Sequence, residues 1–149
     1  MKPQIINDIY LIREVLESFD KSDFDHHSSC YHSSTGFPLG CCADTTHLLG
    51  LFLKQRYNKS SQYVTAYGLG DRENQSHTWL ICDEFIIDIT ADQFNNKGYD
   101  VMKVIVEKES LFHRLFDRVD CCTLNTESLE GTPVVSVLNK VISKMEDIE

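Results

Sequence analysis

The sequence predicts an α+β fold in which helices pack on an antiparallel sheet. Apolar residues follow helical spacing near both ends of the chain, and strand-like runs fill its middle. The chain has 149 residues, near the commonest domain size, so we expect a single domain over residues 1–149. Apolar residues make up 42% of the sequence, which is typical of a folded globular protein.

The N-terminal segment predicts an amphipathic helix over residues 3–19. Apolar residues recur at steps of three and four from Ile5 to Phe19, with charged residues between them. Irregular polar sequence follows over residues 21–40, with three histidines, two glycines and one proline. A loop of this length inside a domain is usually functional or disordered.

Two further helices are predicted. One begins near Cys42, because Leu48, Leu49, Phe52 and Leu53 suit a buried helix. The other closes the chain, since apolar residues from Val134 to Met145 follow helical spacing and Pro133 suits a first helical turn. The N-terminal helix and the helix that begins near Cys42 are expected to pack on the sheet.

The middle of the chain predicts an antiparallel sheet. A break at residues 58–61 precedes runs rich in β-branched and aromatic residues. These runs, and a fourth strand after a turn, cover residues 63–69, 76–82, 84–90 and 101–107. Residues 109–116 are expected to form a short helix or an extended segment, and residues 120–133 a second loop.

The second and third of these strands predict a hairpin with a specific register. A turn at Asp83 and Glu84 places Cys82 opposite Phe85. Opposite residues, and alternate residues along a strand, share one face of a sheet. His77 and Asp88 then become diagonal neighbours, with Cβ atoms about 7 Å apart, close enough for a hydrogen bond.

An aspartate is unusual in the apolar strand Phe-Ile-Ile-Asp-Ile that contains Asp88. An orienting carboxylate for His77 explains it. On the same register Trp79 and Thr90 share the face of His77 and Asp88.

Cys42 is the predicted nucleophile. It lies where a loop containing Gly40 enters a helix, and the free N–H groups and dipole of a helix start stabilise a thiolate. His77 can pair with this thiolate as an imidazolium, and Asp88 can fix the tautomer of His77. Backbone N–H groups at the helix start can bind a developing oxyanion. The adjacent Cys41 is an alternative nucleophile.

These residues resemble a known motif. Gly40, Cys42 and Asp44 read Gly-x-Cys-x-Asp, and a His-x-Trp strand and an Asp strand follow. The pattern is similar to the transglutaminase-like branch of the papain-type cysteine superfamily over about residues 36–94. The resemblance implies a papain-like or transglutaminase-like core, with the cysteine at a helix start and the histidine and aspartate on adjacent strands.

The resemblance implies a Cys-His-Asp triad of Cys42, His77 and Asp88 that hydrolyses an amide bond in a protein or peptide. The enzyme would be a cysteine peptidase or a glutamine deamidase and would need no cofactor. Two alternatives stay open, namely acyl transfer to an amine and a non-catalytic interaction module that keeps the fold. The extra domains of the large calcium-dependent transglutaminases are absent, so calcium and cross-linking do not transfer.

Two residues are second-tier candidates for substrate binding. Trp79 could contact substrate, or it could be a core aromatic between the sheet and the second helix. Gln93 could donate to an oxyanion, or it could cap the end of its strand. The remaining cysteines are expected to be small buried residues, and His47 and His113 to be ordinary surface or semi-buried residues. These cysteines are Cys30, Cys82, Cys121 and Cys122.

Several other functions are not expected. His26, His27, Cys30, His32 and Cys41 lack the spacing of a zinc site, so no metal is predicted. The net charge of −9, without a basic cluster, disfavours nucleic acid. No apolar run reaches the roughly 20 residues that span a bilayer. Charges interrupt the N-terminus where a secretory signal would be apolar, so we expect a cytoplasmic protein with reduced cysteines.

Overall fold

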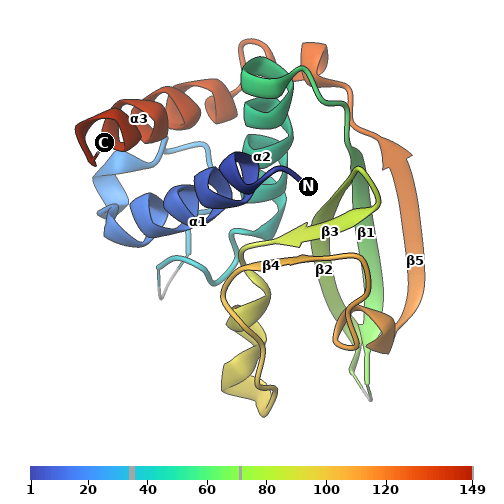
Figure 1. Cartoon of the computed structure of the whole chain (residues 1–149). Coiled ribbons are helices and arrows are strands. Elements are labelled where there is room, and N and C mark those ends of the chain that lie inside the picture. Colours follow the sequence, from blue (N-terminus) through green and yellow to red (C-terminus); the bar gives the residue numbers. More distant parts are fainter. Residues whose placement is uncertain (34–35, 71, 149) are drawn as a thin grey trace.

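A computed structural model describes residues 1–33, 36–70 and 72–148, except for the side chains of residues 72–74. Three helices lie on one side of a sheet, as Figure 1 shows, and the α+β prediction is confirmed. Helix α1 spans Pro3–Ser18, α2 spans Cys42–Tyr57 and α3 spans Pro133–Ile148. Short 3-10 helices are η1 (Lys21–Asp23), η2 (Ala91–Lys97), η3 (His113–Leu115) and η4 (Thr126–Leu129). Within these described ranges no helix combines the length and apolarity needed to cross a membrane.

The sheet has five strands in the order β4-β3-β2-β1-β5, and all neighbours are antiparallel. The strands are β1 (Gln62–Leu69), β2 (Arg72–Cys82), β3 (Phe85–Asp88), β4 (Ile105–Glu107) and β5 (Phe116–Thr123). The predicted hairpin register is confirmed, since Cys82 pairs with Phe85 and Leu80 with Ile87. β3 ends at Asp88, two residues before the predicted strand end.

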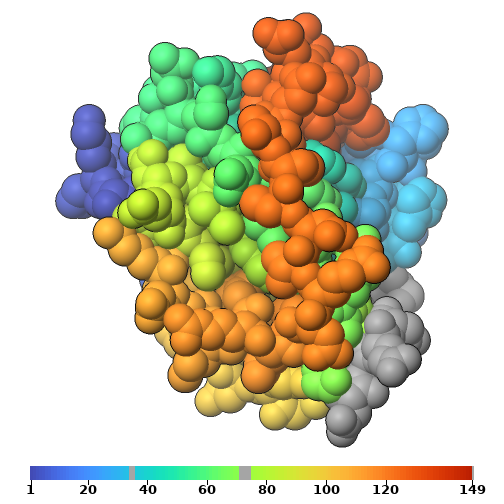
Figure 2. Space-filling view, turned by 90° about the vertical axis from the view of Figure 1, so that its right-hand side faces the viewer, coloured from blue at the N-terminus to red at the C-terminus, as the bar shows by residue number. Residues whose placement is uncertain are grey.

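The sequence did not predict the last strand. β5 occupies residues that were expected to be the end of a short segment and the start of a loop. It is an edge strand, and all its residues after Phe116 are exposed, so its sequence lacks the alternation that identifies a half-buried strand. Figure 2 shows β5 (orange) at the surface of this side of the molecule. β4 is also shorter than the predicted strand over residues 101–107.

The sheet separates two apolar clusters. The larger one joins α1, α2 and α3 to one face of the sheet, where Leu80 and Cys82 lie. The smaller one covers the opposite face and contains Trp79, Phe94 and Phe116. Trp79 therefore does not pack the sheet against α2, because successive residues of β2, such as Trp79 and Leu80, face opposite sides of the sheet.

The long loop before α2 is anchored to that helix. Asp44, in the first turn of α2, accepts hydrogen bonds from the backbone N–H and the hydroxyl of Ser29, at 2.6 and 2.9 Å. Phe24 and Cys30 are buried in the larger cluster. The part of the loop from Phe24 to Cys30 is therefore packed against the domain. Its contact with Ser29 gives Asp44 a structural role at the start of α2.

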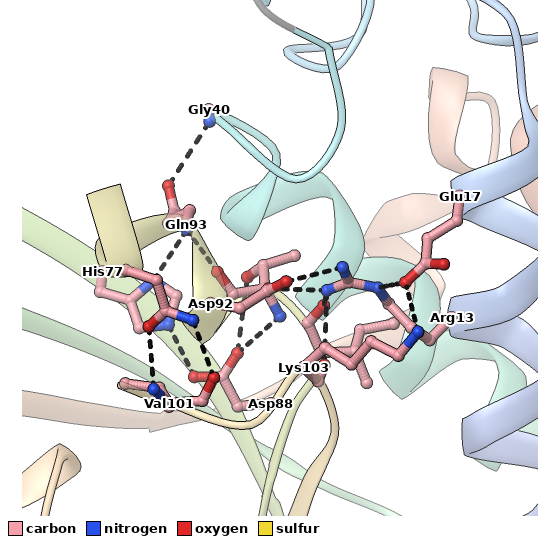
Figure 3. Close-up of polar contacts among 12 residues, drawn as sticks. Arg13, Glu17, Gly40, His77, Asp88, Asp92, Gln93, Val101 and Lys103 are labelled. Carbon is pink, nitrogen blue, oxygen red and sulfur yellow. Dashed lines mark hydrogen bonds and ion pairs between the residues drawn. The ribbon is translucent and has the colours of Figure 1, made fainter. Parts of the chain in front are cut away.

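Arg13 fixes the segment that follows β3. Its guanidinium is almost fully buried and forms two hydrogen bonds of 2.7 Å with the carboxylate of Asp92. It also donates to the carbonyl of Ile89 at 2.5 Å. Burial alone would lower the pKa of Arg13, but hydrogen bonds to Asp92 and Glu17 raise it. Figure 3 shows this side chain reaching from α1 to η2, which carries Gln93.

Replacing Arg13 with Met should destabilise the protein by about 2–4 kcal/mol, because Asp92 and the Ile89 carbonyl would lose their buried partner. Urea denaturation followed by circular dichroism measures the change. Glu17→Gln is the matched control, since this half-exposed partner of Arg13 should contribute less than about 1 kcal/mol. Equal losses in the two variants would show that the Arg13–Asp92 pair does not anchor η2.

Candidate active site

His77 and Asp88 form a buried pair. The Nε2 atom of His77 lies 2.6 Å from Oδ2 of Asp88, and the two side chains are 0% and 1% exposed. β2 and β3 bring them together as the predicted register requires. The second oxygen of Asp88 accepts the Thr90 N–H at 2.9 Å. Because its Nε2 is occupied, His77 presents Nδ1 to the rest of the site.

Cys42 lies beside His77. It is the first residue of α2, and its thiol interacts with the side chains of His77 and Thr78. Cys42 is half-buried, whereas the adjacent Cys41 is fully buried. The thiol of Cys41 faces the carbonyl of Leu39 at 3.6 Å and the thiol of Cys30. Of the two adjacent thiols, Cys42 is the one placed to exchange a proton with His77.

The electrostatics of the pair favour a thiolate. Burial alone would raise the pKa of the Cys42 thiol, but the hydrogen bond and the charge of His77 lower it overall. Burial alone would lower the pKa of His77, but the charge and hydrogen bond of Asp88, with Cys42, raise it to about 9. Both shifts favour a thiolate at Cys42 beside a protonated His77.

Gln93 lies at the open side of His77. Its side-chain nitrogen is 3.4 Å from Nδ1 of His77 and donates to the Thr90 carbonyl at 3.0 Å. Its oxygen faces the Gly40 N–H at 3.5 Å, as Figure 3 shows. Gln93 belongs to η2, and the Thr90 carbonyl that it contacts lies two residues beyond the end of β3. Its amide lies next to the atoms that would react.

Trp79 is buried at 3% exposure. Its ring packs 5.8 Å from the ring of His77 and 4.4 Å from that of His113. The structure therefore places Trp79 as a wall behind His77, on the face of the sheet opposite the larger cluster. Little of the Trp79 side chain is therefore exposed to a substrate.

His113 belongs to the site, and the prediction that it is an ordinary residue was wrong. Its Nε2 lies 2.7 Å from Oδ2 of Asp88, the oxygen that His77 also contacts. Its Nδ1 lies 2.6 Å from the hydroxyl of Ser110. A histidine in an apolar segment after a serine, Ser-Leu-Phe-His, was the only sequence signal. His47 is half-buried and stacks on Tyr63 with ring centroids 4.6 Å apart.

The side chains of His77, Asp88 and His113 are of the types that bind metal ions. Ligand atoms of His77, Asp88 and His113 lie within 4.8 Å of one another. Distances of 2.6 and 2.7 Å to a single oxygen are those of hydrogen bonds, and a metal would have to replace both ring protons. In the long loop Asp25, His26 and His27 also cluster, but both histidines are exposed.

The other cysteines divide into two groups. Cys30 and Cys82 are buried, as predicted. Cys121 and Cys122 are exposed on β5, so the prediction that they are buried was wrong because β5 is an edge strand. Their exposure provides reference thiols for labelling experiments.

A scan of the sequence against protein-family models found no match. Searches of curated proteins and of solved structures found no similar protein either. The chemistry of the site is therefore argued from its own geometry.

Iodoacetamide should alkylate Cys42 at pH values well below 8.5, where an ordinary thiol is protonated. In His77→Ala burial would be opposed only by the hydrogen bonds of Thr78, which raises the pKa of Cys42, so labelling at pH 6–7 should fall at least about tenfold. Mass spectrometry at each cysteine measures the rates, with Cys122 as internal reference and His32→Ala as control. A Cys42 rate that follows Cys122, or that ignores His77, would contradict the thiolate–imidazolium pair.

Proposed function

We propose that this protein is a thiol-dependent hydrolase that cleaves an amide bond of a protein or peptide. One observation carries the proposal. A half-buried cysteine at a helix start interacts with a histidine whose Nε2 is held by a buried carboxylate. Nucleophile, base and orienting acid in this order are the parts that acyl chemistry needs.

Acylation would start from the Cys42 thiolate. Its sulfur attacks the carbonyl carbon, and the electron pair of the C=O bond moves to oxygen. The free N–H groups at the start of α2 and the side-chain amide of Gln93 would be the donors to this oxyanion. The His77 imidazolium then gives its Nδ1 proton to the leaving nitrogen as the C–N bond breaks. An acyl thioester remains on Cys42.

Deacylation would use the same residues in reverse roles. Neutral His77 takes a proton from water, whose oxygen attacks the thioester carbon. The C–S bond breaks, the acid leaves and the thiolate–imidazolium pair is restored. An amine in place of water would give acyl transfer, and a glutamine side chain as substrate would release ammonia. Water is the simplest acceptor that the half-buried site admits.

The arrangement supports a relationship to the transglutaminase-like and papain-like cysteine enzymes, which we propose for residues 36–94. A helix start carries the cysteine, and two adjacent antiparallel strands carry the histidine and aspartate. The α+β architecture is compatible with this assignment.

A peptide digest incubated with the protein and a small primary amine should identify the reaction. New peptide termini indicate a peptidase, glutamate with ammonia a deamidase, and an amine adduct a transferase. Cys42→Ala should abolish each product, and Asp88→Asn should lower the rate about 10²–10⁴-fold because His77 loses its orienting acceptor.

Cys41→Ala is the matched control, since its neighbouring thiol is fully buried and faces away from His77. It should retain activity. Products that Cys42→Ala still forms, or that Cys41→Ala alone loses, would contradict the assignment of the nucleophile. A wild-type protein without any of the three products would favour the non-catalytic module.

A further inference from the structure

Asp88 has one more partner than the proposed mechanism uses. His77 and His113 both place Nε2 at hydrogen-bond distance from the same oxygen, at 2.6 and 2.7 Å. The side chains of Asp88 and His113 are 1% and 2% exposed. A triad needs one histidine on its carboxylate, and the second one comes from η3, 25 residues further along the chain.

The tautomer of His113 follows from its contacts. An ionised carboxylate only accepts hydrogen bonds, so Nε2 of His113 must carry a proton and donate to Asp88. In the neutral ring Nδ1 is then an acceptor, and the hydroxyl of Ser110 at 2.6 Å can donate to it. Hydrogen bonds therefore link Ser110, His113, Asp88 and His77 in series, and Cys42 interacts with His77 at the end of this series.

Aromatic rings enclose these hydrogen-bonded side chains on the side of the smaller apolar cluster. The ring of His113 lies 4.4 Å from that of Trp79 and 5.2 Å from that of Phe112. Water is excluded from Asp88, so each donor on its carboxylate acts in a medium of low polarity and has a large effect.

We propose that His113 is a positioning residue that keeps the Asp88 carboxylate charged and turned toward His77, so that the reactive pair of Cys42 and His77 survives into acidic solution. The inference rests on the proposed function and adds a fourth side chain to it. His113 does not touch Cys42 and acts only through Asp88.

The sign of the effect follows from the forces on Asp88. Burial alone would raise the pKa of this carboxyl group, whereas the charge of His77 and the hydrogen bond of His113 hold it well below its usual range. Without His113 burial is opposed less strongly, so Asp88 binds a proton at a higher pH. His77 then loses its counter-charge, and Cys42 loses its imidazolium partner.

Other titratable groups also face Asp88 and Cys42. The titratable groups that face Asp88 are His77 from β2 and His113 from η3. Besides His77, Tyr63 of β1 faces Cys42. Burial raises the pKa of Tyr63, so it stays neutral in acid. Asp44 carries the nearest acidic group on α2 itself, where it is bonded to Ser29.

The test is the acid side of the Cys42 alkylation profile in three full-length proteins. His113→Phe keeps a ring of similar size and removes the donor, and the midpoint should move up by about one pH unit or more. His113→Gln keeps an N–H donor, and its midpoint should stay closer to that of the wild type. Thermal melting followed by circular dichroism checks that each variant is folded.

A merely structural role gives another result. In that case His113→Phe lowers the melting temperature but leaves the midpoint where it is, and the inference is overturned. Should this variant not fold, His113→Leu removes the same donor with a smaller side chain, and a midpoint identical to the wild type would count equally against the proposal. A wild-type Cys42 that alkylates independently of His77 would instead overturn the proposed function itself.

Nuclear magnetic resonance of imidazole-labelled wild-type protein gives a readout that needs no variant. His113 should show a protonated Nε2 that is protected from solvent, with Nδ1 as acceptor. A ring protonated only on Nδ1 cannot donate to Asp88 and would contradict the role.

Discussion

The buried carboxylate of Asp88 is the constraint on which the site depends. Burying a charged carboxylate away from water costs free energy unless hydrogen-bond donors satisfy its oxygen atoms. His77, His113 and the Thr90 N–H provide these donors, and they come from β2, η3 and the segment after β3. Satisfying one carboxylate thus fixes three parts of the chain relative to one another. The same contacts aim Nδ1 of His77 at Cys42.

The six residues from Asp88 to Gln93 connect this pair to the rest of the domain. Asp88 points to the histidines, while Asp92 and the Ile89 carbonyl are held by Arg13 from α1. Gln93 follows directly and faces the reactive side of His77. A short segment between two buried ion pairs has little freedom, so catalytic geometry here is linked to the packing of α1. This link explains why a helix far from the thiol contributes to the site.

Sequence patterns predicted the parts of the site that depend on local periodicity. Alternation along two strands placed His77 beside Asp88, and the helix boundary placed Cys42 at a helix start. Contacts between distant segments left no such trace. His113 contacts Asp88 from 25 residues away, and Arg13 contacts Ile89 from 76 residues away. Neither separation shows in the periodicity of a helix or a strand. β5 was missed because an exposed edge strand has no apolar face to alternate.

The central claim is that Cys42 is ionised at neutral pH because Asp88 holds His77. The ultraviolet absorbance of the thiolate, taken as the difference between the wild type and Cys42→Ser across a pH titration, tests it most directly. We expect a thiolate signal that is already present near pH 6 in the wild type and that appears only at higher pH in Asp88→Asn. A signal that appears only near the roughly 8.5 of a free cysteine, with or without Asp88, would contradict it.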